Sequence, residues 1–274
     1  MTERENTPTK EEVTWALAVK RAVEEDPTLS KNSSAISDFE LLQHSIVAKG
    51  NTEKALRRIK RLFRFKEKYG ILGDGSYEQG LRDVVAFENT LPDFTLGCAM
   101  AKDGTQVLSF DFSRYKVRRL ESNEACAICM RAFFYSLQCC SANLEMIRNG
   151  VRLLGDFGGL SWDNFSVTAE KRAAELYSDC YPMRMKEMIM MDANPLIRIF
   201  YGVLKLFLSK KVAQTFKFPK NRDQHLKHES NCGLDAIPTC WGGNHSREEL
   251  GKLFPERLKQ RYVNVERFRL PKKQ

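Results

Sequence analysis

Apolar residues recur every three or four positions through most of the first 75 residues, which is the spacing of one buried helix face. The helices predicted there run from Thr9 to just before Pro27, from Ser37 to about Val47, and from Thr52 to about Tyr69. The first two begin with a hydroxyl residue followed three positions later by Glu, the spacing of a capping box. We therefore expect residues 1–80 to form a helical N-terminal domain.

From Thr95 onwards, short alternating runs of apolar and polar residues replace the helical period. A hairpin is predicted around Lys102-Asp103-Gly104. The further predicted elements are a helix from about Glu121 to Arg148, a strand in 151–160, a helix from about Ser166 to Ser178, and a strand in 185–192. This order is typical of an α/β domain with a largely buried sheet, which we assign to residues 81–246. Residues 247–274 are expected to be a basic C-terminal tail.

The segment P-L-I-R-I-F-Y-G-V-L-K-L-F-L, at 195–208, is apolar almost all round a helical wheel. Arg198 and Lys205 interrupt it, and it is shorter than the roughly 20 apolar residues that cross a bilayer. Such a helix is buried on both sides, covers a ligand, or lies at a membrane interface. Its periodicity leaves these three interpretations open.

The formal net charge of +9 favours anionic partners such as nucleic acid, phosphoinositides or an acidic membrane face. Nucleic acid is not expected, because no zinc-finger or RRM signature is present and no aromatic residues interleave with the basic ones. One predicted helix face, which either is solvated or docks anions, carries Arg57, Arg61, Arg64 and Lys68. The polar start of the chain predicts a cytoplasmic protein with reduced thiols.

Little in the sequence supports catalysis or a metal. Cys126, Cys129, Cys139 and Cys140 share one helical stretch with no His nearby, so they are expected to be core thiols. No nucleophile elbow or phosphate-binding loop is found. The carboxylates Asp111, Asp156 and Asp192 each follow a predicted strand, which keeps a Mg²⁺-dependent phosphotransferase as a remote alternative. We expect no enzyme, cofactor or metal site.

Four motif regions, in order, resemble the CRAL-TRIO lipid-binding family over roughly residues 36–244. They are G-N-T-E-K-A-L-R-R-I-K-R-L-F-R-F-K-E-K-Y-G-I (50–71), the pair D-G-T-Q-V-L-S-F-D-F and V-R-L-L-G-D-F-G-G-L, the stretch that begins Y-P-M-R-M-K-E-M-I-M-M-D-A-N-P, and I-P-T-C-W-G-G (237–243). The resemblance implies a helical cap beside a mixed sheet that floors an apolar cavity, with 195–208 as a mobile gate helix.

The resemblance also implies a function. The chain would bind a lipid or isoprenoid-like molecule and transfer it between membranes, as a monomer that touches anionic membrane transiently. The cavity residues expected from it are Phe110, Phe133, Leu154, Met188, Met190, Phe200, Leu204 and Phe207. The residues expected to contact phosphoinositides or membrane are Arg184, Lys186 and Lys211. A sensor or scaffold that holds lipid without transferring it is the alternative.

The sequence departs from the family in places that affect the ligand. Met183, Val212 and Thr215 stand where the phosphatidylinositol-binding branch has a Glu and a Thr-x-x-Lys pair, so an inositol-headgroup site is not expected. The tocopherol-carrier branch is the better match, although a further basic residue of its phosphoinositide set also falls on Thr215. Gly155 and Phe157 replace branched residues, which predicts a widened or reshaped pocket.

Overall fold

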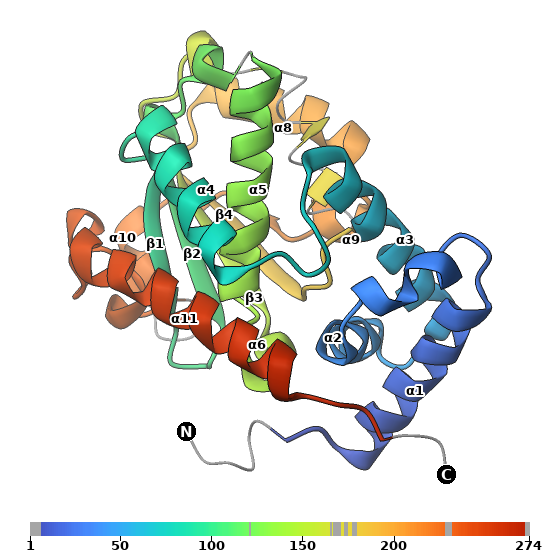
Figure 1. The fold of residues 1–274 in the computed structure, drawn as a ribbon. Helices are drawn as coiled ribbons and strands as arrows, with labels where there is room; N and C mark the ends of the chain where they lie inside the picture. The colour runs from blue at the N-terminus through green and yellow to red at the C-terminus, as the bar shows by residue number, and fades with distance from the viewer. Residues whose placement is uncertain are drawn as a thin grey trace.

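The computed structural model describes residues 7–120, 122–164, 166, 171–172, 175–176, 180–227 and 232–271. Figure 1 shows a group of N-terminal helices, in blue, beside a sheet that helices cover. This is the predicted fold class, a helical N-terminal cap next to an α/β domain with a mixed sheet.

The N-terminal helices are α1 (Lys10–Glu25), α2 (Asp38–Ala48) and α3 (Thr52–Tyr69), with a 3-10 turn at Ser30–Ala35. The capping box of α1 is formed as predicted, since Thr9 Oγ1 accepts from the amide of Glu12 and the Glu12 carboxylate accepts from the amide of Thr9. Ser37 caps α2 with its side chain. Asn51, and not the predicted Thr52, caps α3. Asn is at least as good an N-cap as Thr, which moves this boundary by one residue.

An additional helix, α4 (Tyr77–Thr90), follows the Gly-rich turn where the helical region was expected to end. The side chain of Ser76 caps it. It packs on α5 (Asn123–Cys139), and Phe87 meets Phe133 and Phe94 edge-on or tilted. By its contacts, α4 belongs to the α/β part.

Five strands form one sheet in chain order: β1 (Thr95–Met100), β2 (Gln106–Asp111), β3 (Val151–Asp156), β4 (Met185–Met191) and β5 (Phe216–Lys217). β1 and β2 are the predicted antiparallel hairpin, and the remaining pairs are parallel. Parallel strands need long crossovers, and here helical segments supply them. The carboxyl ends of the parallel strands β2, β3 and β4 therefore lie at the same end of the sheet.

A bulge in β4 changes where its first side chains point. The register shifts at Arg152, which pairs with Glu187 so that Lys186 is the extra residue. A bulge sets two consecutive side chains against one on the neighbouring strand. Accordingly, Arg152 Nε lies 3.4 Å from the Glu187 carboxylate, and Lys186 Nζ lies 3.7 Å from the carboxylate of Asp103, which also binds Arg152.

The helix predicted from Glu121 to Arg148 is in fact two helices, α5 and α6 (Leu144–Asn149). Cys140 ends α5, and Asn143 caps α6 by accepting a hydrogen bond from the amide of Met146. Asn favours caps over helix interiors because its short side chain bonds nearby backbone groups. The apolar pattern runs through this break, which is why the sequence did not show it.

The described chain continues with α8 (Pro195–Leu204), a 3-10 turn at Lys205–Phe207, α9 (Lys210–Ala213), α10 (Arg222–Lys227) and α11 (Arg247–Arg267). The helix predicted from Ser166 to Ser178 lies largely outside the described residues. The predicted C-terminal tail is mostly the helix α11, drawn in red in Figure 1. Leu250 packs so closely on Gly97 that a Cβ at Gly97 would lie 2.4 Å from it. The Leu270 amide donates to the side chain of Asp38. The segment from Leu250 to Leu270 therefore connects the edge strand β1 to α2.

The sheet is buried on both faces. Leu108, Phe110 and Leu153 point to the face covered by α4 and α5. Leu154 and Ile189 point to the other face, towards Trp241, Leu250 and the other side chains of residues 226–253 in the same cluster. Because both faces are buried, the strands consist of apolar runs. A cavity can exist only where a covering helix is not in direct contact with the sheet.

Candidate functional site

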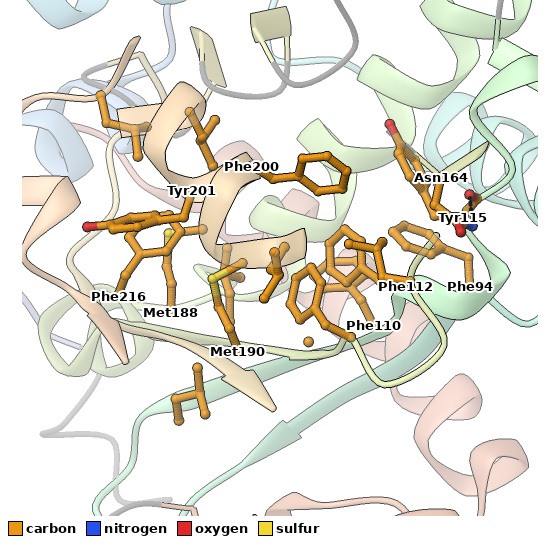
Figure 2. A pocket seen from close by; sticks show the side chains of 18 of the residues that line it. Phe94, Phe110, Phe112, Tyr115, Asn164, Met188, Met190, Phe200, Tyr201 and Phe216 are labelled. Atoms are coloured by element: carbon orange, nitrogen blue, oxygen red, sulfur yellow. Dashed lines mark hydrogen bonds between the residues drawn. The ribbon is translucent and has the colours of Figure 1, made fainter. Parts of the chain in front are cut away.

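An apolar cavity of about 100 Å³ lies between the sheet and α8. Figure 2 shows Phe200 projecting from α8 towards Phe110 and Phe112, with Met188 and Met190 below it on β4. The lining side chains come from β2 to β5, α5 and α8, and from the segments before β1 and after β2, β3 and α8. It lies beneath the 195–208 segment, where the family resemblance implies a cavity.

The floor follows from the alternation of strand side chains. Phe110 on β2, Leu153 on β3, and Met188 and Met190 on β4 all project to the same face of the sheet. Methionine side chains adapt to irregular shapes, which suits a floor that faces a variable occupant. The floor is therefore fixed in its backbone and adjustable at its surface.

Gly155 also belongs to the floor, but it does not widen the cavity. Phe112 and Phe157 stack at 4.2 Å between centroids beside it, and a Cβ on Gly155 would lie 2.6 Å from Phe157 and 2.9 Å from Phe112. The two rings fill the space beside Gly155. The reshaping of the pocket expected from Gly155 and Phe157 stays a prediction.

Aromatic rings form much of the wall. Phe94 contacts Phe110, Phe112, Tyr115 and Phe133 with centroids 5.2 to 6.3 Å apart. Phe94 lies in the turn before β1, outside any periodic run, so the sequence gives no signal for it. Other lining residues that the sequence did not single out include Phe112, Tyr115, Leu153, Leu160, Asn164, Ile197, Tyr201, Leu208 and Phe216.

The roof is α8. Asn194 caps it and also donates to the carbonyl of Leu160 at 3.0 Å, while Tyr201 Oη donates to the carbonyl of Ala213 at 2.7 Å. Phe200 is buried beneath the helix and meets Trp162 edge-on at 5.4 Å. A few polar bonds at its ends and apolar contacts between them thus hold the roof in place.

Two of the polar side chains that line the cavity, Asn164 and Tyr201, are hydrogen-bonded to other parts of the chain. Asn164 donates to the Tyr115 carbonyl and accepts twice from Ser161, and the Tyr201 hydroxyl is bound to Ala213. A polar group brought into this cavity would lose its water without gaining a partner from these side chains. Such a loss costs about 1–3 kcal/mol in proteins.

Six of the eight predicted cavity residues line the cavity: Phe110, Phe133, Met188, Met190, Phe200 and Leu204. Leu154 does not, because it points to the opposite face of the sheet and packs with Ile189 and Trp241. Its neighbour Leu153 takes that place, as the alternation of side chains along a strand requires. The side chain of Phe207 lies outside the described part of the structure. Contact of any of these residues with a ligand stays a prediction.

The outer side of the roof is apolar and surrounded by lysines. Ile199 is 57% exposed, Leu206 is 80% exposed, and Trp162 beside the helix is 65% exposed. The exposed lysines of the same region are Lys205, Lys210, Lys211, Lys217 and Lys220.

The predicted phosphoinositide residues do not share one environment. Lys211 is exposed on α9. Lys186 is directed by the bulge towards Asp103, on the sheet face away from the cavity floor. Arg184 is partly buried and donates to the carbonyls of Ile46 and Arg148, at 3.0 Å each. Of the three, Lys211 lies next to the exposed apolar side of α8.

The three strand-end aspartates lie at one edge of the sheet, and Asp111 and Asp156 are register partners. Asp111 accepts from the amide and hydroxyl of Ser113, and Asp156 accepts from the amide of Gly158, two residues further along the chain in each case. Such bonds end strands. In the part of the chain that the structure describes, no group of three or more His, Cys, Asp and Glu side chains is arranged to hold a metal ion.

The cysteines are core residues, as predicted. Cys126, Cys129, Cys139 and Cys140 are buried and unbridged in or at the end of α5. Across the described ranges, no helix combines the length and apolarity needed to cross a bilayer.

Comparison with known proteins gives the same fold and domain. The family model described as CRAL/TRIO domain matches residues 99–243. The chain is 27% identical over 118 residues to human tyrosine-protein phosphatase non-receptor type 9, covering 42% of this chain and 19% of that protein. It is 25% identical over 129 residues to human alpha-tocopherol transfer protein-like, covering 46% of this chain and 37% of that protein. The match thus spans less than half the length of these curated relatives.

A crystal structure of Sfh5 superposes with a TM-score of 0.55, covering 94% of this chain and 98% of that one at 11% identity. At that identity the likeness concerns the fold alone. It extends over the N-terminal helices as well as the sheet.

Proposed function

Because this chain belongs to the CRAL-TRIO family of lipid-binding and lipid-transfer proteins, we propose that it binds the apolar part of one lipid beneath α8 and carries it between membranes. Members of this family typically transfer lipids and are not enzymes, so we assign the chain no catalysis of its own. The region matched in the phosphatase relative is a small part of that protein. The carrier would work in the cytoplasm, as a protein that touches membranes transiently.

The observation that carries this proposal is the apolar cavity under α8 with its polar side chains Asn164 and Tyr201 already bonded. Moving a lipid chain through water costs about 0.8 kcal/mol for each exposed CH₂, which a carrier avoids by enclosing the chain. The aromatic wall and the Met188 and Met190 floor provide such an enclosure. The favoured ligand carries a hydrocarbon or isoprenoid part inside the cavity and no hydrogen-bonding group there.

Loading would require α8 to move. A volume of about 100 Å³ is smaller than the engineered cavity of about 150 Å³ that holds benzene, so a lipid chain does not fit with the roof in this position. The roof is attached mainly at Asn194 and Tyr201. Lifting it would expose the apolar inner face of α8, which is favourable only where another apolar phase receives that face.

A membrane is the surface that fits. Ile199, Leu206 and Trp162 offer apolar contact, and Lys205 and Lys211 lie close to them in sequence on α8–α9. Each basic residue near an anionic bilayer contributes about 1 kcal/mol. We propose that docking of this side on anionic lipid, phosphoinositides included, accompanies opening of the roof.

The test is native mass spectrometry of the purified protein, followed by vesicle-to-vesicle transfer of the lipid that is identified. One bound lipid per chain is expected, together with transfer that anionic acceptor vesicles accelerate. Ile199→Glu should keep the bound lipid and lose most of the transfer. The matched control is Val85→Glu, which changes an equally exposed apolar residue on α4 and should transfer normally.

The small cavity also favours a second candidate, a scaffold or sensor that does not exchange lipid. A chain that is lipid-free when purified and takes up nothing from mixed liposomes would contradict the carrier and support the scaffold. Stable binding without transfer to any acceptor would support the sensor.

A further inference from the structure

Two buried thiols meet where the edge strand β1 passes the end of α5. Cys98 Sγ and Cys140 Sγ are 3.5 Å apart, and both side chains are at most 1% exposed. Cys139 lies next to them in sequence, but its thiol donates to the carbonyl of Phe254 on α11. The facing pair is therefore Cys98 with Cys140.

A guanidinium polarises this pair. Arg257 of α11 donates from one nitrogen to Cys98 Sγ at 2.8 Å and to Gln106 Oε1 at 2.6 Å. The hydrogen bond from Cys140 and the positive charge of Arg257 lower the pKa of Cys98 to about 6, against the opposing effect of burial. The hydrogen bond to Cys98, together with burial, raises the pKa of Cys140. One sulfur is thus set up as a thiolate and the other as its thiol donor.

We propose that Cys98 and Cys140 form a thiol oxidation site, at which a small hydroperoxide converts the pair into a disulfide. The Cys98 thiolate attacks the peroxide oxygen, the O–O bond breaks, and hydroxide or alkoxide leaves and takes up a proton, giving Cys98 sulfenic acid. The Cys140 sulfur then attacks the Cys98 sulfur, the S–O bond breaks and water leaves. Overall, two thiols are oxidised and one peroxide is reduced to water and either water or an alcohol.

The surroundings allow the sulfurs to close this gap. A disulfide needs about 2.05 Å between them, so they must approach by roughly 1.5 Å. Cys140 is the cap at the end of α5, and Cys98 follows the register shift of β1 at Gly97. Cys98 lies within β1, paired with Leu108, whereas Cys140 follows the last residue of α5, and α11 contacts both elements. The bond would tie the sheet edge to α5 across 42 residues of chain.

The experiment uses the full chain carrying Cys240→Ser, because Cys240 is the exposed cysteine among the free thiols. Treatment with hydrogen peroxide should lower the intact mass by about 2 Da, the mass of the two hydrogens lost, and peptide mapping should join Cys98 to Cys140. Cys140→Ser should instead gain about 16 Da, one oxygen, at Cys98, trapped by dimedone. Cys180→Ser is the matched control: it removes another buried thiol, one whose pKa burial raises to about 12, and should leave the disulfide unchanged.

Arg257 is a positioning residue in this proposal, and its test is the pH profile. In the Cys240→Ser chain, alkylation of Cys98 should rise to half its plateau near pH 6, and Arg257→Gln should move that midpoint upwards by at least about one pH unit. A Cys98 that reacts no faster than Cys180, a cross-link through Cys139, or no mass change before the chain unfolds would each overturn the proposal. Peptide mapping of the Cys240→Ser chain, which retains Cys98 and Cys140, tests the proposed disulfide even where a serine variant at either position fails to fold.

Discussion

The guanidinium of Arg184 donates a hydrogen bond of 3.0 Å to the carbonyl of Ile46 in the last turn of α2. A second bond of 3.0 Å runs from the same side chain to the carbonyl of Arg148 at the end of α6. Arg184 therefore connects the N-terminal helices to the start of β4. Arg184 was expected to contact phosphoinositides or membrane, and in the structure its guanidinium holds two parts of the chain together.

Replacing Arg184 should lower stability. Hydrogen bonds from charged donors contribute about 1.5–3 kcal/mol each when buried. Because Arg184 is only partly buried, losing its two bonds in Arg184→Met should reduce the free energy of unfolding in urea by somewhat less than their sum, about 2–4 kcal/mol. Arg184→Lys should recover only part of this, because an ammonium lacks the fork that reaches two carbonyls. Lys186→Met, which breaks an exposed 3.7 Å pair, should cost under about 1 kcal/mol. Equal losses for Arg184→Met and Lys186→Met would contradict the role given to Arg184.

Among the charged residues of the helical part, Lys66 should cost the most stability when it is replaced. It is 6% exposed and donates to both Glu40 and Asp74. Burial and the neighbouring Asp74 charge raise the pKa of Glu40 to about 8, so at pH 7 Lys66 mainly balances the Asp74 carboxylate. Lys66→Met leaves that buried carboxylate without its cation, which should cost about 3–5 kcal/mol at pH 7 in chemical denaturation. The loss should shrink as the pH falls, because protonation removes the unpaired charge. The control Lys68→Met, half-exposed on the same helix, should change stability by under about 1 kcal/mol.

Even the smallest substitution of Gly155, to alanine, should lower the stability of the protein. A Cβ there meets Phe157 and Phe112 at under 3.0 Å, so Gly155→Ala should displace the stacked rings, cost about 1–3 kcal/mol and change lipid uptake. Gly202→Ala on α8 is the matched control, since nothing lies within 4 Å of its Cβ position. It should be neutral or stabilise the helix by up to about 1 kcal/mol. Thermal unfolding and ligand uptake of the two variants test this pair.

Asp103 should stabilise the folded protein near neutral pH and lose this effect in acid. Although burial alone would raise its pKa, the bonds from Arg152, at 2.8 and 3.0 Å, and from Thr105 hold it below the usual 3.8. A lowered pKa means that the contribution is present above about pH 4 and is lost as the pH falls further. The stability difference between the protein and Asp103→Asn should therefore be constant from about pH 5 to 7 and narrow below about pH 4.

Lys211 and Lys186 should differ in membrane binding. Lys211 is exposed beside the apolar outer side of α8, whereas Lys186 is directed towards Asp103 on the other sheet face. Lys211→Ala should weaken binding to anionic vesicles about fivefold, from the loss of about 1 kcal/mol, and Lys186→Ala should change it little. Sedimentation with vesicles at two salt concentrations measures both, and equal effects would contradict the docking side proposed above.

The sequence by itself determined the elements that local chemistry specifies. Thr9 with Glu12 starts α1, and Asp103-Gly104 turns the hairpin, because neighbouring residues alone decide caps and turns. The apolar run of 195–208 predicted a helix that is buried on both sides, covers a ligand or lies at a membrane interface, and it did not decide among the three. Order and type of most elements, and therefore the fold class, followed from these signals.

Tertiary structure decided what depends on contacts between distant segments. Both Leu153 and Leu154 are apolar and buried, so only the packing of the two sheet faces selects Leu153 for the cavity. The bulge that turns Lys186 away depends on the pairing of β4 with β3. Arg184 meets Ile46, and Cys98 meets Cys140, across long stretches of chain. Periodicity records which positions are buried, whereas the partner of a buried side chain is set only when the layers pack together.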